Sequence, residues 1–101
     1  MVIEIRKTEA FAAWLDGLSD LRGRARILAR IERLRGGNFG DWESVGDGIG
    51  ELRIDAGPGY RVYFTRIGSG IVVLLAGGDK KSQARDIRRA KGMAKQLEDL
   101  K

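Results

Sequence analysis

The sequence contains no cysteine and no histidine. Without cysteine the chain can form neither disulfides nor thiolate metal sites, which is typical of proteins in a reducing cytoplasm. Without histidine it cannot carry out reactions in which a pair of imidazole groups transfers protons. No cluster of acidic residues has the spacing of a metal site either. We therefore expect the protein to need no metal and no other cofactor.

Long apolar stretches are also missing. No run approaches the roughly 20 residues of a membrane-spanning helix, and the start of the chain lacks the pattern of a secretion signal. A chain of 101 residues is long enough for one domain and too short for two. A composition of 43% hydrophobic and 33% charged residues favours a folded chain over a disordered one. We expect a single domain over residues 1–101, located in the cytoplasm and not bound to membranes.

Positive charge predominates, because 19 Lys and Arg residues against 14 Asp and Glu residues give a net charge of +5. Residues 21–37 hold six arginines and one glutamate, and residues 79–101 hold eight basic and four acidic side chains. Such a balance favours an anionic partner, either nucleic acid or an acidic protein segment. Two solvated helix faces would give the same pattern, so charge alone does not choose between these interpretations.

The first part of the chain predicts one strand and two helices. Residues 2–7 alternate between apolar and polar side chains, which predicts a short strand with one buried face. Residues 9–19 and 21–34 carry apolar side chains at helical spacing, after Thr8 and Asp20 as predicted N-caps. In the second helix we expect the arginines to face outward and four apolar side chains to face inward. These four are Leu21, Leu28, Ile31 and Leu34.

The second part of the chain predicts three strands and a helix. Residues 51–55 and 60–66 alternate with period two, and the glycine and proline residues between them are typical of a turn. Residues 71–76 are apolar on both faces, as in a central strand, and helical spacing resumes from Ser82. The order β-α-α-β-β-β-α predicts an α+β fold, in which a helical hairpin packs on one face of a mainly antiparallel sheet.

The other face of this sheet is predicted to carry polar side chains. If 51–55 and 60–66 pair as a hairpin, Arg53 and Arg61 lie near each other on that face. Like charges that face each other across two strands repel, so we expect either a bound anion or Asp55 between them. Two solvated arginines with Asp55 as a local counter-ion is the alternative.

Three stretches of the sequence resemble a known family. These are "ELRID" (51–55), "GPGYRVYF" (57–64) and "LLAGGDKKSQARDI" (74–87). They resemble the RelE/ParE superfamily of toxins from type II toxin–antitoxin modules, and more narrowly its HigB-like branch of phage-derived addiction module killer proteins. The resemblance extends from Ile3 to about Leu97. It implies the same α+β fold, cleavage of mRNA in the ribosomal A site, and a neutralising antitoxin, expected to be a helix-turn-helix protein from the adjacent gene.

The resemblance also implies a set of site residues. In such metal-independent cleavage the RNA 2′-hydroxyl is the nucleophile, and the enzyme transfers protons and stabilises the phosphorane. Arginine suits phosphate binding, and lysine or tyrosine can carry protons if the pKa is shifted. We expect Arg53 and Arg61 to bind phosphate, and Arg61, Tyr63, Lys80 and Lys81 to form the catalytic set, with Tyr63 able to stack on a base.

The end of the chain departs from the family pattern. Several ribosome-dependent members carry a His or Tyr near the C-terminal end, whereas this chain has neither after Tyr63. Lys80 or Lys81 would then have to serve in that role.

The arginine-rich second helix is a candidate surface for the antitoxin. Its candidate contact residues are Arg22, Arg26, Arg30 and Arg33. Two other functions remain open from the sequence: a ParE-like inhibitor that poisons DNA gyrase without cutting RNA, and a non-toxic binding module retained for regulation.

Overall fold

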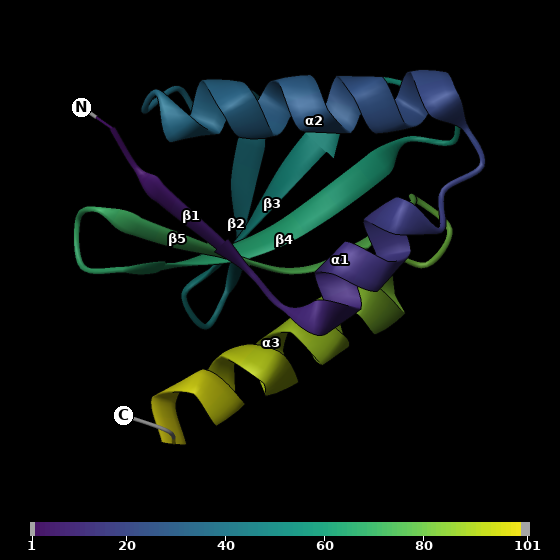
Figure 1. The fold of residues 1–101 in the computed structure, drawn as a ribbon. Coiled ribbons are helices and arrows are strands. Elements are labelled where there is room, and N and C mark those ends of the chain that lie inside the picture. Colours follow the sequence, from purple (N-terminus) through teal and green to yellow (C-terminus); the bar gives the residue numbers. More distant parts are fainter. Residues whose placement is uncertain (1, 100–101) are drawn as a thin grey trace.

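The computed structural model describes residues 2–99, which form three helices and one five-stranded sheet (Figure 1). In chain order the elements are β1 (Glu4–Lys7), α1 (Glu9–Asp16), α2 (Leu21–Arg35), β2 (Trp42–Gly46), β3 (Ile49–Ile54), β4 (Tyr60–Ile67), β5 (Ile71–Gly78) and α3 (Gln83–Asp99). The strand order is β1-β5-β4-β3-β2. Only the β1–β5 pair in this sheet is parallel. The predicted α+β fold class is confirmed.

Helices cover both faces of the sheet. The apolar side chains of α1 and α2, such as Phe11 and Ile27, pack on one face with Leu52, Val62 and Leu74. The opposite face packs against α3, and Figure 1 shows α2 and α3 on opposite sides of the sheet. The expectation that this second face is open is therefore wrong over the part that α3 covers. None of the helices in the described chain is long and apolar enough to cross a membrane.

One strand was not predicted. Residues 42–46 form β2 at the edge of the sheet, and none of the strands expected from the sequence includes them. Trp42 pairs with Leu52 and remains 43% exposed. The strand is short and mostly exposed, and its register shifts between Ser44 and Gly46, so its sequence lacks the alternation that marks a half-buried strand.

The buried stripe of α2 differs from the predicted one. Leu21 is 75% exposed and Leu28 is 44% exposed, so these two residues do not face inward. Arg30, expected on the outside, is only 9% exposed. Its guanidinium donates hydrogen bonds to the carbonyl oxygens of Phe39 at 3.0 Å and Asp41 at 2.9 Å, and to that of Arg53. Arg30 can be buried because these carbonyls accept its donors, so that its charged group is not left without hydrogen bonds.

The predicted N-caps of α1 and α2 are confirmed. The Thr8 hydroxyl accepts a hydrogen bond from the Phe11 amide at 3.0 Å, and the Asp20 carboxylate accepts one from the Gly23 amide at 3.0 Å. Each bond satisfies an amide in the first turn of a helix, where no backbone acceptor is available. The second oxygen of Asp20 accepts a hydrogen bond from the Tyr60 hydroxyl at 2.8 Å, which links the start of α2 to β4.

Candidate functional site

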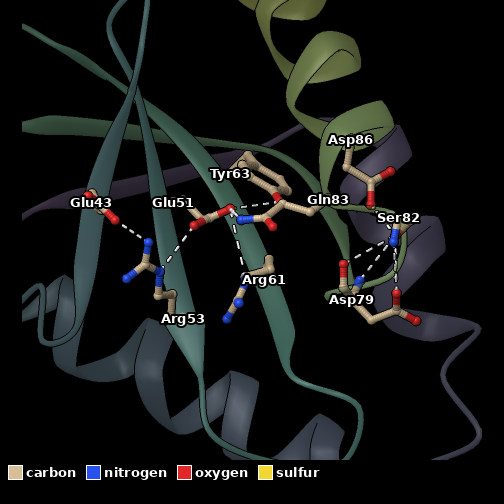
Figure 2. A network of polar contacts seen from close by, with 9 residues as sticks. All are labelled: Glu43, Glu51, Arg53, Arg61, Tyr63, Asp79, Ser82, Gln83 and Asp86. Carbon is tan, nitrogen blue, oxygen red and sulfur yellow. Dashed lines mark hydrogen bonds and ion pairs between the residues drawn. The ribbon is translucent and has the colours of Figure 1, made fainter.

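Two arginines face each other in the middle of the polar sheet face. Arg53 on β3 lies directly opposite Arg61 on β4, as the sequence predicts. The group between them is Glu51, not Asp55, because Arg53 Nε donates to Glu51 Oε1 at 3.2 Å and Arg61 Nε lies 4.0 Å from Glu51 Oε2 (Figure 2). One carboxylate therefore offsets the repulsion between the two guanidinium groups.

Glu51 is fully buried and has further partners. Its Oε2 atom accepts hydrogen bonds from the Tyr63 hydroxyl at 3.0 Å and from Gln83 Nε2 at 2.8 Å. A buried carboxylate is stable only when donors surround it, and here they come from β3, β4 and α3. The sequence analysis did not select Glu51 as a site residue. The available signal was its position two residues before Arg53, on the same face of the same strand.

Tyr63 does not have the exposure that base stacking requires. It is fully buried beneath α3, and its hydroxyl donates to Glu51. Burial, together with the neighbouring Glu51 carboxylate, raises the pKa of this hydroxyl well above its ordinary value. The expectation that Tyr63 stacks on a base is therefore wrong. Its hydroxyl instead helps to hold the Glu51 carboxylate in place.

Arg53 and Arg61 differ in how many of their donors are already used. Arg53 also donates to Glu43 on β2, so two carboxylates hold it, and its hydrogen bond to Glu51 raises its pKa further. The guanidinium of Arg61 makes no hydrogen bond to another residue within 2–99, and its buried Nε has no hydrogen-bond partner, only the distant Glu51 carboxylate. Figure 2 shows its terminal nitrogens on the side away from Glu51. Arg61 therefore has more donors available for an anion than Arg53 has.

The corner after β5 sends its two lysines in different directions. Arg61 pairs with Gly78, and Lys80 lies beside Gly59, whose added Cβ would be 3.6 Å from Lys80 Cβ. Lys80 lies beyond the end of β5, in the corner that leads to α3, and its contact with Gly59 places it beside the start of β4. Lys81 lines a separate hollow beyond the edge of β5. Both lysines are exposed, and Lys80 is the one that lies beside Gly59, two residues before Arg61.

Three of the four arginines predicted to bind an antitoxin are on the surface. Arg22, Arg26 and Arg33 are exposed on α2, and Arg26 also donates to the carbonyl oxygen of Asp55 at 2.9 Å. Arg30 does not belong to this surface because its guanidinium is buried against backbone carbonyls. In the part of the chain that the structure describes, no three acidic side chains are grouped closely enough to hold a metal ion.

Comparisons with known proteins bear on the family and the fold of this chain. Residues 13–97 match the family model described as phage derived protein Gp49-like (DUF891). An uncharacterized protein of Haemophilus influenzae is 54% identical over 97 residues, which is 96% of this chain and 98% of the relative. A double mutant of the toxin RelE from E. coli, solved in the free state, superimposes with a TM-score of 0.65 and 15% identity. This match covers 88% of this chain and 98% of RelE. The fold that the resemblance implies is confirmed, since it is the fold of RelE.

Proposed function

We propose, on the premise that this chain belongs to the phage-derived Gp49-like protein family, that it is the toxin of a type II toxin–antitoxin module. We further propose that it acts as a metal-independent endonuclease on mRNA at the ribosome, and that an antitoxin from the adjacent gene neutralises it. The family and the fold of RelE support the toxin assignment. The pair of Arg53 and Arg61 supports the proposed nuclease activity.

The nuclease proposal rests on one observation, the partly buried guanidinium of Arg61 with its unused terminal nitrogens. Its guanidinium is held against the sheet, with only 14% of the side chain exposed, yet its terminal nitrogens are not used by the described residues. A guanidinium held in this way offers two parallel N–H groups to the oxygens of a phosphate. Its partial burial and the nearby Glu51 carboxylate limit its movement before the substrate arrives, and donors positioned in advance stabilise developing charge most effectively.

The proposed reaction needs three contributions from the protein. The 2′-hydroxyl oxygen attacks the adjacent phosphorus and gives its proton to solvent, while the 5′-oxygen leaves with a proton, so that a 2′,3′-cyclic phosphate forms. Arg61 binds the non-bridging oxygens and stabilises the phosphorane. Arg53 adds positive charge from the opposite strand. Lys80, two residues along from the Arg61 partner Gly78, is the candidate donor of the proton to the 5′-oxygen.

A cell-free translation extract tests this function. We expect the purified protein to produce mRNA cuts in phase with codons, mapped by primer extension, and Arg61→Ala to reduce cutting about 100-fold, the usual effect of losing one donor to an oxyanion. The matched control is Arg66→Ala, because Arg66 lies on the same strand but stacks on the Phe39 ring at 4.4 Å.

Two results would contradict the nuclease proposal. One is intact mRNA in an extract whose translation has stopped, and the other is full activity of Arg61→Ala. A supercoiling assay with DNA gyrase, run at the same protein concentrations, covers the alternative target. Inhibition of supercoiling with intact mRNA would replace the nuclease by a gyrase inhibitor. If expression of the protein alone leaves bacterial growth normal, the toxin assignment itself is wrong.

A further inference from the structure

A second basic hollow lies beyond the outer edge of β5. β1 pairs with β5 only from Ile71 to Leu74, so within residues 2–99 no strand covers the last part of that edge. The hollow there has a volume of about 500 Å³. Side chains from α1, from the corner after β5 and from the first turns of α3 line it, among them Trp14, Lys81, Arg85 and Arg89. None of these residues takes part in the arrangement around Glu51.

A glycine brings the aromatic side chain to this hollow. A Cβ atom on Gly77 would lie 2.1 Å from the Trp14 ring, so only glycine allows the indole to lie against β5. Trp14 is half-buried, with its ring 5.8 Å from Phe11 and 6.1 Å from Tyr60 between centroids. These contacts fix the indole in place, while the part of it that lines the hollow stays accessible.

Three cations surround the same space. The side chains of Arg85 and Arg89 are 65% and 50% exposed, and Lys81 is exposed as well. Asp86 lies fully buried beneath the two arginines, at 3.4 Å from Arg85 and 3.9 Å from Arg89. It orients both guanidinium groups without reaching the hollow surface. Asp79 also lines the hollow, and its carboxylate accepts a hydrogen bond from the Ser82 amide at 3.1 Å. Three cations therefore face one carboxylate, so the net charge of the lining is positive.

We propose that this hollow is a second RNA subsite, which binds a backbone phosphate through Lys81, Arg85 and Arg89 and contacts a base through Trp14. Sites for single-stranded nucleic acid combine cations along the backbone with an aromatic ring for the bases, and this hollow has both. Gly78 lines the hollow and is also the β5 partner of Arg61, so the hollow begins one strand away from Arg61 and one RNA strand can contact both. The inference takes RNA as the ligand from the proposed function and extends its path across the molecule.

Fluorescence of Trp14 tests the subsite directly. In a Trp42→Phe, Arg61→Ala protein, Trp14 is the single tryptophan and the proposed cleavage is suppressed, so a short single-stranded RNA oligonucleotide can be titrated. We expect the RNA to change the emission of Trp14. Lys81→Ala and Arg89→Ala should each weaken binding about tenfold, as expected for one charge-assisted contact. Each should also reduce the slope of log affinity against log salt by about 0.7.

The matched control is Arg88→Ala, because Arg88 is exposed on the same helix but does not line the hollow. It should bind RNA as tightly as the parent protein. Unchanged Trp14 emission on RNA addition, or equal weakening by Arg88→Ala and Arg89→Ala, would overturn the subsite.

The binding assay contains no ribosome, so it fails or succeeds separately from the proposed function. A Trp14 response that depends on Lys81, together with intact mRNA in the extract, would support the subsite and contradict the nuclease. Codon-phased cuts without any Trp14 response would support the nuclease and contradict the subsite.

Discussion

Glu51 has no exposed surface, and it lies between two arginines that face each other across β3 and β4. A substrate cannot reach this carboxylate, so it acts through the groups that it holds. It binds Arg53, attracts Arg61, and is itself held by Tyr63 and Gln83. In the proposed reaction Glu51 is a positioning residue that keeps the guanidinium of Arg61 ready for phosphate.

The first prediction concerns this carboxylate. Glu51→Gln keeps the shape but removes the charge, which leaves two facing arginines without their shared counter-ion. We expect a loss of about 3 kcal/mol in the free energy of unfolding, measured with urea, and a marked loss of mRNA cleavage. The matched control is Glu43→Gln, because Glu43 is 60% exposed and pairs only with Arg53. It should cost less than about 1 kcal/mol. Equal losses in the two variants would contradict this role of Glu51.

The second prediction distinguishes a structural role of Tyr63 from a catalytic one. Tyr63→Phe removes a hydroxyl that donates to the buried Glu51, and it leaves the ring packed. We expect the free energy of unfolding to fall by about 1–2 kcal/mol while the rate of mRNA cleavage in the extract stays within about twofold of the parent. A cleavage rate reduced about 100-fold in a folded Tyr63→Phe protein would restore Tyr63 to the catalytic set.

At the scale of elements, the start of α2 is tied to β4 by a carboxylate that titrates in acid. The Gly23 amide and then the Tyr60 hydroxyl donate to Asp20, and these bonds lower the pKa of its carboxyl. Because the folded-state pKa lies below the unfolded one, the stabilisation by ionised Asp20 is complete above the ordinary value of 3.8. It is lost as the pH falls through the lowered pKa.

The third prediction follows from the direction of the pKa shift of Asp20. The parent protein should unfold at a higher temperature than Asp20→Asn at neutral pH, and the difference should shrink once the pH falls below the ordinary carboxyl pKa of 3.8. Tyr60→Phe, which removes one of the two donors, should show a smaller dependence of the same sign. Thermal melts over this pH range measure both. A difference that stays constant down to the lowest pH would show that the ionisation of Asp20 does not stabilise α2.

The elements that the sequence predicts are those with a strong apolar period. The strand 60–66 and the strand 71–76 are recognisable because burial on one or two faces leaves a pattern in the sequence. β2 leaves no such pattern, since it is exposed at the sheet edge. The outward assignment of Arg30 followed from its charge alone. Its spacing from Ile27 and Leu34 places it on the buried stripe, and the spacing was the better guide.

At the scale of the whole molecule, the proposed catalytic face and the basic surface of α2 are on different sides of the sheet (Figure 1). Arg22 and Arg33 are exposed on α2, and neither contacts the residues around Glu51. An acidic antitoxin segment could therefore bind α2 without sharing contacts with the RNA.

The fourth prediction uses this separation. Arg22→Glu combined with Arg33→Glu should leave the toxicity of the protein unchanged and should weaken neutralisation by the adjacent gene product about tenfold or more. Survival of bacteria that co-express the two proteins measures neutralisation, and expression of the toxin alone measures toxicity. Full neutralisation of the double variant would show that the antitoxin binds elsewhere.

The sequence predicts which types of residue form the site better than it predicts how deeply those residues are buried. Strand alternation predicts that Arg53 and Arg61 share one face, and their proximity follows if the two strands form a hairpin, as they do. The burial of Glu51 and Tyr63 depends on α3, which comes later in the chain and packs on a face that looked open. Likewise, alternation cannot tell that Lys80 and Lys81 diverge, because the chain leaves the strand at this corner.

The position of β5 has a consequence for synthesis of the protein. β5 lies between β1 and β4 in the sheet, and the Thr8 hydroxyl donates to the Leu75 carbonyl 67 residues away in the chain. A ribosome that stops before Ile71 releases a chain in which the β1 segment has no described partner strand and β4 lacks one of its two neighbours. The strands β2, β3 and β4 pair without β5, but such a chain also lacks Gln83, which donates to Glu51. Interrupted translation therefore yields fragments that contain the arginine pair without the support that β5 and α3 give it.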